Sequence, residues 1–365
     1  MKFHVKEKPE KLLIVRLSAL GDVVDVLPAL RSLRSHFPDS KIAWLVEDRT
    51  SDILSDHPDI DEIIVFPRKR WQRNIFKINK FFDTLSDIIF FYKKLRSDSY
   101  DCVIDFHGNL KSGIMTFLTG SKNRIGFGKG HCKEFNYLFT KYHIYPAKKR
   151  MHRIERNLSL LSGLHISTHF QKPEIPISAE CDKFVTRFLD TINSSSKTII
   201  IVHACTSEYG SYKRWSTSNY AILTDMILEH FEAKIIFTWG PNELDIVNEI
   251  VGKMRGSASV ACKTTIKQLT ELIRHADLFI GGDTGPLHIA STLCIPTVAI
   301  FGPKDPIVYG PYNGRSIVVN KELPCSPCRK RTCSDTQCIT SILPEEVFDA
   351  VSRLMKEHLY KKNIG

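Results

Sequence analysis

The stretch "ADLFIGGDTGPLHIA", Ala276 to Ala290, joins an apolar run to a glycine-containing turn and then to a second apolar run. The first run is short and contains Leu278, Phe279 and Ile280, a pattern typical of a buried strand. Pro286 comes after the turn, and proline favours the first turn of a helix because its missing N–H needs no partner there. We therefore predict a strand, a tight turn and a helix, which is the repeating unit of a parallel sheet.

Apolar runs of the same kind recur along the whole chain. They lie at 11–17, 41–46, 62–66 and 102–106, and again at 198–204, 233–239, 276–282, 296–302 and 316–319. Helical patterns fill the intervals, for example over 24–37, where Leu27, Leu30 and Leu33 share one face. A chain of 365 residues is long enough for two domains.

Two series of strands and helices predict an α/β protein with two Rossmann-like domains that face each other across a cleft. We place an N-terminal domain at 1–175 and a C-terminal domain at 185–343. The amphipathic segment that starts at Pro344 predicts a C-terminal helix within 344–365, which could cross back to the N-terminal domain.

The composition excludes several classes of protein. With 42% hydrophobic and 25% charged residues, the chain is typical of a globular protein. It contains no run of about 18 apolar residues, which a membrane-spanning helix requires. The apolar run near the N-terminus is short and interrupted by Arg16, which argues against a signal peptide. We therefore expect a cytoplasmic protein whose cysteines are reduced.

The net charge of +11 is concentrated in three basic clusters, at 68–80, 147–153 and 328–331. Such clusters suit a polyanion, namely nucleic acid, anionic lipid head groups or phosphorylated sugars, although each could equally be a solvated surface. We expect no nucleic-acid partner, because no reader motif is present and the clusters lie far apart in the sequence.

The residues directly after the first strand are candidates for a functional site, because ligands in open α/β sheets bind beyond the carboxyl ends of the strands. The first run leads into "SALGDVV", where Gly21 permits a tight turn and Ser18 offers a hydroxyl, and we expect both residues to bind the donor. Asp22 either caps the next helix or serves as a general base. The helix start favours its ionised form, which can accept a proton as a new bond forms.

Polar residues also come after the first two strands of the second series. Thr206, Ser207 and Lys213 come after its first strand and suit phosphate oxygens. Glu243 comes after its second strand and could accept ribose hydroxyls or merely stabilise the start of a helix.

The turn in the opening stretch predicts a site for a diphosphate. It supplies Asp283, Thr284, Gly285, Pro286 and His288. Glycine lets the backbone approach a ligand closely, and a helix start presents N–H groups together with the positive end of the helix dipole. The turn is neither a GxGxxG nor a Walker A motif, so NAD and P-loop interpretations lack their usual support.

Taken in order, these motifs resemble those of the ADP-heptose lipopolysaccharide heptosyltransferases, glycosyltransferase family 9. "LIVRLSALGDVVDVLPALRSLR" is similar to the family's N-terminal signature, with Asp22 in the place of its catalytic base. "KRW" (213–215) matches its phosphate-binding lysine motif, and "DTGPLHIA" together with "VAIFGPKDP" matches its donor-nucleotide motif. The resemblance covers nearly the whole chain. It implies a GT-B fold, inverting transfer from ADP-L-glycero-β-D-manno-heptose, and catalytic roles for Asp22 and Lys213.

Within the family, the N-terminal half resembles heptosyltransferase I, which adds the first heptose to Kdo2-lipid A. This resemblance depends on "PRKRWQRNIFK", "YDCVIDFHGNLKSG", "NRIGF", "CKEFNYLF" and "HRIERNLSLL". It implies acceptor contacts from Arg70 and Arg73, and from Lys133, where the family tends to have arginine. Two alternatives stay open: a heptosyltransferase II-like enzyme that adds a later heptose, and a nucleotide-sugar-binding protein without catalytic activity.

The segment 71–95 mixes aromatic and basic residues at helical spacing. We predict a helix that either lies in a membrane interface or packs on its own domain with its lysines solvated. Because lipid A is anchored in the inner leaflet, the family resemblance makes peripheral attachment to the cytoplasmic face of the inner membrane chemically sensible.

Four cysteines lie close together in "CSPCRKRTCSDTQC". They are Cys325, Cys328, Cys333 and Cys338. One CxxC could form half of a zinc site, but the remaining spacings do not match the usual paired arrangement. No Asp-x-Asp motif lies after a strand in a suitable turn, so neutralising a diphosphate needs no metal ion. We expect no metal and no cofactor.

Overall fold

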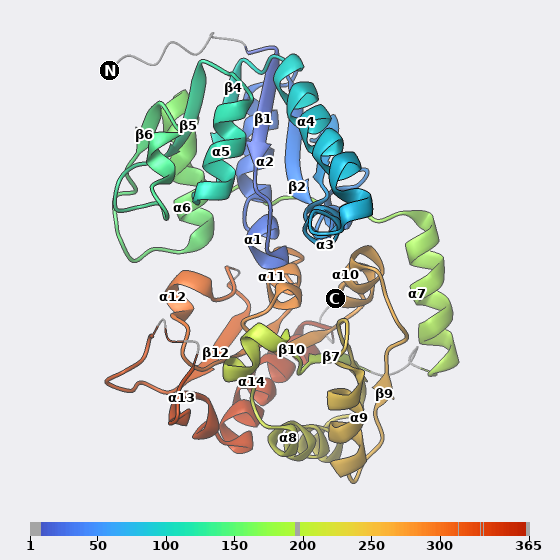
Figure 1. Ribbon diagram of the computed structural model, residues 1–365. Coiled ribbons are helices and arrows are strands. Elements are labelled where there is room, and N and C mark those ends of the chain that lie inside the picture. Colours follow the sequence, from blue (N-terminus) through green and yellow to red (C-terminus); the bar gives the residue numbers. More distant parts are fainter. Residues whose placement is uncertain (1–8, 194–197, 313, 329, 331, 363–365) are drawn as a thin grey trace. The chain divides into compact units, whose positions relative to one another are not determined.

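The computed structural model describes residues 9–362 except 194–197, 313, 329 and 331, with side chains described as far as residue 357. The chain divides into two compact units, Met1–Pro176 and Ile177–Gly365. Each unit contains one six-stranded sheet in which all neighbouring strands are parallel (Figure 1). The nine strands expected from the apolar runs are all present.

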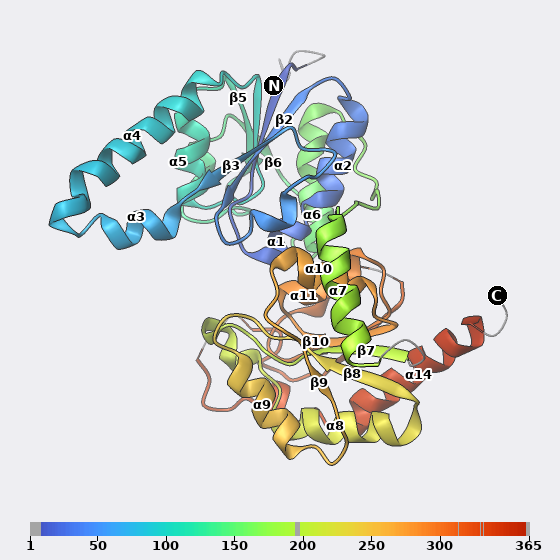
Figure 2. The ribbon, with the colours of Figure 1, turned by 90° about the vertical axis from the view of Figure 1, so that its right-hand side faces the viewer.

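The sheet of the N-terminal unit has the strand order β3-β2-β1-β4-β5-β6. Its strands are β1 (Lys11–Val15), β2 (Lys41–Glu47), β3 (Glu62–Phe66), β4 (Cys102–Asp105), β5 (Asn123–Phe127) and β6 (Tyr142–Ile144). The connecting helices are α1 (Leu20–Val24), α2 (Leu27–His36), η1 (Asp52–Leu54), α3 (Arg68–Asn74), η2 (Ile78–Lys80), α4 (Phe81–Ser97), α5 (Leu110–Leu118), η3 (Asn136–Leu138), α6 (Arg153–Ser159) and η4 (Leu160–Leu164). Figure 2 shows α4 and α5 on one side of the sheet and α2 and α6 on the other. With both faces covered, β1, β2 and β4 are buried almost throughout.

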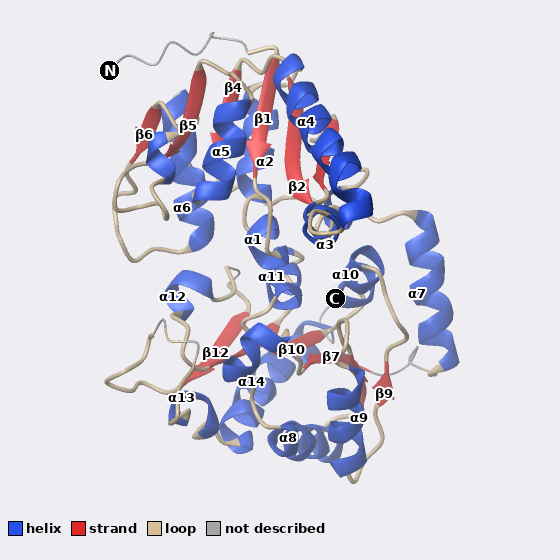
Figure 3. Ribbon diagram, in the orientation of Figure 1, coloured by secondary structure: helices blue, strands red, loops and turns tan. Residues whose placement is uncertain are grey.

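The sheet of the C-terminal unit has the strand order β12-β11-β10-β7-β8-β9. Its strands are β7 (Thr198–His203), β8 (Ala233–Phe237), β9 (Ser259–Val260), β10 (Leu278–Gly282), β11 (Thr297–Phe301) and β12 (Ser316–Asn320). The helices are α7 (Ala179–Thr191), η5 (Glu208–Lys213), α8 (Thr217–His230), α9 (Leu244–Lys253), α10 (Ile266–Arg274), α11 (Gly285–Thr292), α12 (Pro306–Tyr309), α13 (Gln337–Thr340) and α14 (Pro344–Lys362). Figure 3 shows these helices in blue around the red strands. Among the described residues, no helix has the length and apolarity needed to cross a bilayer.

The helix at the C-terminus, α14, packs on α8, β11 and β12 of its own unit. Val347, Val351 and Met355 lie on its inner face and are almost completely buried in the core of the unit. This core packing takes place within the C-terminal unit, and the crossing of this helix to the N-terminal domain stays a prediction.

The prediction of a single helix over residues 71–95 is wrong, because the segment folds as the helix α3, the short turn η2 and a second helix, α4. The buried residues of the segment explain the break. Trp71 and Thr84 are both buried, yet residues 13 positions apart point about 140° away from each other on one continuous helix. The turn between the helices lets both side chains face the protein. Thr84 and Leu95, 11 positions apart, share one face of α4 and need no break.

The helix expected over 24–37 is likewise divided, into α1 and α2. Pro28 lies in the first turn of α2, where its missing N–H cannot continue the hydrogen-bond ladder from α1. The break leaves α1 as a separate short helix directly after β1.

Both sheets have the same topology when the strands are counted within each unit. In each sheet the strand order reverses between the first and fourth strands, namely between β1 and β4 and between β7 and β10. The carboxyl ends of strands at such a point open a crevice that commonly binds ligands. The residues directly after these four strands are therefore the first candidates for a site in each unit.

Candidate active site

Asp22 lies in α1, directly after β1 at the reversal point of the N-terminal sheet. Its Oδ2 accepts a hydrogen bond from the backbone N–H of Ala19 (3.2 Å), so it stabilises the helix start from the third helical position. Its Oδ1 is ion-paired with Arg16 Nη2 (2.8 Å) and with Arg153. The Asp22 side chain is 28% exposed, which leaves it accessible to a substrate hydroxyl.

Arg16 is a buried cation at the end of β1 that fixes the Asp22 carboxylate. Its Nη1 donates to the backbone oxygen of Phe106 (2.8 Å), while Nη2 contacts Asp22. Burial lowers the pKa of Arg16, and the Asp22 carboxylate acts in the opposite direction. The hydrogen bond to Phe106, directly after β4, restricts the rotation of the Arg16 side chain. The ion pair with Arg16 therefore restricts the Asp22 carboxylate as well.

The turn after β4 places His107 in the electrostatic field of the same group of charges. Burial, together with the cations Arg16, Lys111 and Arg153, lowers the pKa of His107 to about 3, although the Asp22 carboxylate opposes the shift. The imidazole is therefore neutral at physiological pH. A neutral imidazole can donate or accept a hydrogen bond at this edge of the sheet without adding charge.

The buried carboxylate of Asp105 organises this turn. It accepts hydrogen bonds from the backbone N–H groups of His107 (2.9 Å) and Gly108 (3.0 Å), and from the side chains of Ser112 (2.8 Å) and Asn136 (2.7 Å). Burial raises the pKa of Asp105, against the opposing effect of these four donors.

We expect Asp105→Ala to lower the free energy of unfolding of the N-terminal unit by about 3 kcal/mol, since four donors lose a buried acceptor. Urea unfolding followed by tryptophan fluorescence measures this loss, and Trp44 reports from the core of that unit. The exposed Asp48→Ala is the matched control and should change the unfolding free energy by less than about 0.5 kcal/mol. Equal effects of the two substitutions would contradict the assigned role.

Glu47 lies buried at the end of β2 and is surrounded by three cations. It contacts Lys111, Arg68 Nη1 (3.2 Å) and Arg49 Nη2 (3.6 Å). Burial by itself raises the pKa of Glu47, but the hydrogen bond and charge of Lys111, with the charges of the two arginines, hold it below its usual value. Three cations around one carboxylate leave an excess of positive charge, which suits an anionic group of a substrate.

The three residues expected to bind the acceptor are exposed. Arg70 and Arg73 lie on α3, where Arg70 pairs with Asp87 of α4 (2.7 Å). The same helix carries Arg68, and it is Arg68 that reaches Glu47. Lys133 lies beside the β4–α5 turn, because its backbone N–H donates to the oxygen of Gly108 (2.8 Å).

In the C-terminal unit, the structure brings together Lys213, Asp283 and His288. Lys213 Nζ contacts both the backbone oxygen and the Oδ2 of Asp283, each at 2.7 Å. His288 Nε2 lies 3.9 Å from Asp283 Oδ1. Burial alone would raise the pKa of Asp283, but His288 and Lys213 more than offset it and hold the pKa at about 2. These residues join the turns after β7 and β10 by a charged contact.

The start of α11 agrees with the strand, turn and helix expected from the opening stretch. Thr284 occupies the position before the first helical residue, but its hydroxyl donates to the oxygen of Gly282 (3.3 Å) and does not cap the helix. Gly285 and Pro286 form the first helical positions, and His288 is buried one turn further on. The first N–H groups of the helix are thus not capped by Thr284.

Gly281 has a structural explanation. A Cβ atom there would come within 3.1 Å of the backbone oxygen of His203 and within 3.0 Å of the Phe279 ring. Glycine is therefore needed here because the backbones of β10 and β7 lie close together, and not because a ligand approaches.

Thr206, Ser207 and Glu243 lie near this group, in the turns after β7 and β8. Thr206 is buried, and its Oγ1 has no hydrogen-bond partner among the described residues. Its backbone oxygen accepts from Arg214 (2.8 Å), whereas Ser207 is exposed. Glu243 is buried, which raises its pKa, and its Oε2 accepts from the backbone N–H of Gly240 (2.7 Å). This contact holds the turn before α9, and the Glu243 side chain makes no capping hydrogen bond to the helix itself, so its role toward the donor stays a prediction.

The sequence interpretation assigned no site role to six charged or titratable residues in the groups around Asp22 and Glu47. They are Arg16, Glu47, Arg49, His107, Lys111 and Arg153. Arg16 and Glu47 carried a usable signal, since Arg16 interrupts an otherwise apolar run and Glu47 directly follows one. Arg153 was visible as part of the basic cluster 147–153, but its contact with Asp22 was not, because it joins residues 131 positions apart.

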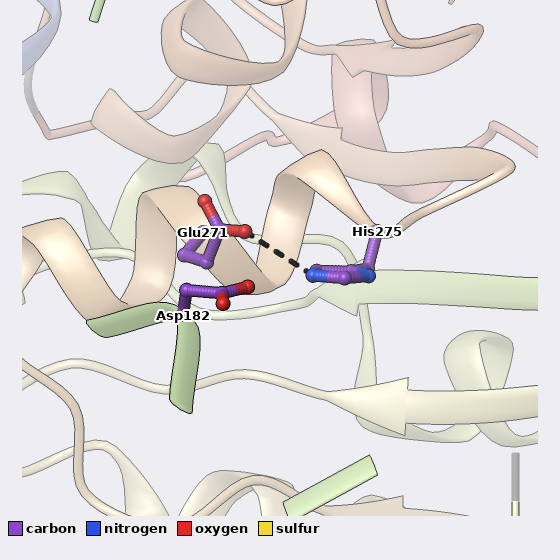
Figure 4. Close-up of side chains that lie close together, drawn as sticks. All are labelled: Asp182, Glu271 and His275. Atoms are coloured by element: carbon purple, nitrogen blue, oxygen red, sulfur yellow. Dashed lines mark hydrogen bonds and ion pairs between the residues drawn. The ribbon is translucent and has the colours of Figure 1, made fainter. Parts of the chain in front are cut away.

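The expectation of no metal ion stays a prediction. Within the described ranges, one group of three potential metal ligands has its ligand atoms within 4.8 Å of one another: Asp182 of α7 with Glu271 and His275 at the end of α10. Figure 4 shows Asp182 beneath the contact between Glu271 and His275 Nε2 (3.2 Å). Arg274 also pairs with Glu271 (3.2 Å), so this group is explained as the contact between α7 and α10.

The four clustered cysteines have free thiols. Burial raises the pKa of Cys338, and its three companions in the segment add to the shift. The segment therefore folds so that its cysteines lie in one neighbourhood, although they do not form a group as tight as the one around Glu271.

Comparison with known proteins identifies the family. The model of glycosyltransferase family 9 (heptosyltransferase) matches residues 88–339. The chain is 26% identical to the lipopolysaccharide core heptosyltransferase OpsX of Haemophilus influenzae, over 86% of this chain and 85% of that protein. It is 25% identical to lipopolysaccharide heptosyltransferase 3 of Escherichia coli, over 92% of this chain and 96% of that protein. Relatives named heptosyltransferase 1 and 2 match at 25% and 27% identity, so identity does not separate the subtypes.

Solved structures share the fold over nearly the whole chain. A glycosyltransferase family 9 protein from Veillonella parvula has a TM-score of 0.82 at 23% identity and covers 95% of this chain and 98% of its own. The structure of the E. coli heptosyltransferase WaaC with ADP-2-deoxy-2-fluoro heptose has a TM-score of 0.71 at 22% identity. The match covers 95% of this chain and 99% of that one. The expected α/β, GT-B fold class is confirmed. The chain belongs to glycosyltransferase family 9, the heptosyltransferase family, and is a glycosyltransferase.

Proposed function

We propose that the protein transfers L-glycero-D-manno-heptose from ADP-L-glycero-β-D-manno-heptose to Kdo2-lipid A, with inversion, in synthesis of the lipopolysaccharide inner core. The observation that carries the proposal is the position of two charged groups, each at the reversal point of a parallel sheet. Asp22 lies after β1 in one unit, and the Lys213–Asp283 pair joins the turns after β7 and β10 in the other. One group suits a proton acceptor, and the other suits a diphosphate.

The donor would place its diphosphate at the start of α11, near Lys213. Asp283 occupies two of the N–H donors of the lysine ammonium and holds it in place. The third donor would point toward the departing ADP, where negative charge grows as the sugar leaves. The N–H groups of Gly285 and the next turn, with the hydroxyls of Thr206 and Ser207, would supply further phosphate contacts. The Thr284 hydroxyl would join them by turning from the oxygen of Gly282 toward the phosphate. His288 helps to keep Asp283 ionised, and the ionised Asp283 holds the ammonium group of Lys213 in position.

Asp22 would accept the proton of the attacking Kdo hydroxyl while the new glycosidic bond forms. The hydroxyl oxygen bonds to the anomeric carbon from the face opposite ADP, its proton passes to the carboxylate, and the bond to the diphosphate oxygen breaks. Arg16 and Arg153 hold the carboxylate in one orientation for this transfer. Ser18 and Gly21, in the turn that carries Asp22, are donor contacts that we propose. The residues themselves provide the charges that this reaction needs, so we propose no cofactor.

The acceptor is anionic, and the cations near the end of β2 suit its carboxylate and phosphate groups. Arg70, Arg73 and Lys133 are the acceptor contacts that we propose from the family resemblance. Because Kdo2-lipid A is a membrane lipid, we place the reaction at the cytoplasmic face of the inner membrane, with the protein attached peripherally.

We expect reversing the charges of Arg70 and Arg73, as Arg70→Glu/Arg73→Glu, to raise the KM for Kdo2-lipid A by about tenfold or more. Binding of ADP-heptose, measured by calorimetry, should change less than twofold, because the nucleotide site lies in the other unit. Lys253→Glu on α9 is a control for the added negative charge. Equal losses of acceptor use and donor binding would reject the assignment.

Product analysis by mass spectrometry tests the proposed function. Purified protein is incubated with ADP-heptose and either Kdo2-lipid A or the same lipid already carrying one heptose. Addition to Kdo2-lipid A supports the heptosyltransferase I-like assignment, whereas addition only to the heptosylated lipid supports a heptosyltransferase II-like enzyme. Binding of ADP-heptose without any product would favour a nucleotide-sugar-binding protein.

A further inference from the structure

We propose that α3, η2 and α4 form a hairpin, residues 68–97, that docks the protein on the surface of an anionic phospholipid bilayer. Figure 2 shows the two helices leaving the sheet of the N-terminal unit, with the turn between them at the end farthest from the sheet. The proposal rests on the peripheral attachment proposed above and names the surface that makes it, and vesicle binding can be measured apart from heptosyl transfer.

The base of the hairpin is anchored in its own unit. Trp71 of α3 packs edge-on against Phe66 of β3 and Phe91 of α4, with ring centroids 5.2 Å and 5.4 Å apart. Leu95 is also buried in this cluster. The hairpin therefore has enough internal packing to keep its shape while its far end stays uncovered.

The far end of the hairpin exposes an unusual amount of apolar surface. Phe76, Ile78 and Phe82 are 91%, 95% and 78% exposed. Leu85 and Ile89 continue from Phe82 at spacings of three and seven residues, so α4 carries an exposed apolar stripe in addition to its buried one. Single exposed apolar residues are ordinary, but a continuous group at the end of a projecting element marks an interaction surface.

The charges of the hairpin indicate which partner covers this surface. Residues 68–97 contain nine Lys and Arg but only two Asp, and one of these, Asp87, pairs with Arg70. Lys77 and Lys80 alternate with the exposed apolar residues at the turn. A bilayer with anionic lipids satisfies both features, since the rings enter the acyl boundary while the ammonium groups meet the phosphates. A second copy would bring the same positive charge against itself, which disfavours self-association through this surface.

Vesicle flotation tests the proposal without donor or acceptor, so its outcome is separate from that of heptosyl transfer. Wild-type protein should float with vesicles of phosphatidylcholine and phosphatidylglycerol, and bind vesicles of phosphatidylcholine alone much less. Phe76→Ser/Phe82→Ser should lower the partition coefficient by about tenfold or more. Lys77→Glu/Lys80→Glu should lower it by a similar factor on the anionic vesicles.

The control is Ile222→Ser, which removes an exposed apolar side chain from α8 of the C-terminal unit and should leave vesicle binding unchanged. Far-UV circular dichroism spectra and thermal unfolding midpoints should be equal in all variants, which shows that they are folded. The proposal is overturned if wild-type protein does not float, or if the control loses binding as much as Phe76→Ser/Phe82→Ser. It is also overturned if sedimentation equilibrium shows the wild type to be a dimer and Phe76→Ser/Phe82→Ser to be a monomer, because a second copy would then cover this surface.

Discussion

Asp22→Asn should lower kcat for heptosyl transfer by about a thousandfold, within the range that general bases contribute. The amide has nearly the size of the carboxylate and can still accept from the Ala19 N–H, but it cannot take a proton from the attacking hydroxyl. The KM for ADP-heptose should change little. Initial rates of product formation at saturating donor and acceptor measure the effect.

A second readout separates this role from a structural one. Removing the Asp22 charge leaves the buried Arg16 without its carboxylate partner, so some loss of stability is expected in addition. Thermal unfolding records that loss, and Asp22→Glu restores the charge as the matched variant. Recovery of stability and of part of kcat in Asp22→Glu supports the proton-acceptor role. Undiminished turnover in the folded Asn variant would remove Asp22 from the mechanism.

Lys213→Met should lower kcat by a factor of one hundred to one thousand, which corresponds to about 3 to 4 kcal/mol of transition-state stabilisation for a single charge at a leaving group. The effect falls mainly on kcat, because negative charge on ADP is greatest as the bond to heptose breaks. Rates are measured with saturating substrates, and binding of ADP alone by calorimetry. Lys253→Met on the surface of α9 is the matched control.

The same substitution should change how stability depends on pH. In the wild type, His288 and Lys213 hold the pKa of Asp283 at about 2 in the folded protein, below its unfolded value of about 4. This ion pair therefore stabilises the fold fully above pH 4 and loses its effect as the pH falls toward 2. In Lys213→Met the folded pKa rises, so unfolding free energy should depend less on pH in this interval. An unchanged pH dependence, or a weaker affinity for ADP with an unchanged kcat, would contradict the assigned role.

Most of the fold can be predicted from local patterns in the sequence. The runs "KLLIVRL" and "ADLFIGG" have the length and content of buried parallel strands, and both form the expected strands β1 and β10. The strands that local reasoning missed are short or lie toward the edges. β6 and β9 have three and two residues, and β5 contains a glycine at position 126. Segments this short carry too little periodicity to identify a strand.

The candidate site was predicted only in part, because the order of residues reveals the turn after each strand but not the side chains that reach that turn from distant segments. Asp22 and Lys213 could be found from their positions after strands. The second guanidinium on Asp22, from Arg153, depends on how α6 packs in the unit. The pairing of Lys213 with Asp283 joins residues 70 positions apart and is visible only once β7 and β10 are neighbours.

The indole of Trp215 connects the loop of Lys213 to the segment that leads into α14. Its Nε1 donates to the backbone oxygen of Ile342 (2.9 Å), two residues before α14 begins, and Trp215 itself lies two residues after Lys213. The loop that carries the proposed catalytic lysine is thus tethered to the segment directly before α14. Substitutions in α14 that displace Ile342 should therefore shift this loop and change turnover without contacting either substrate.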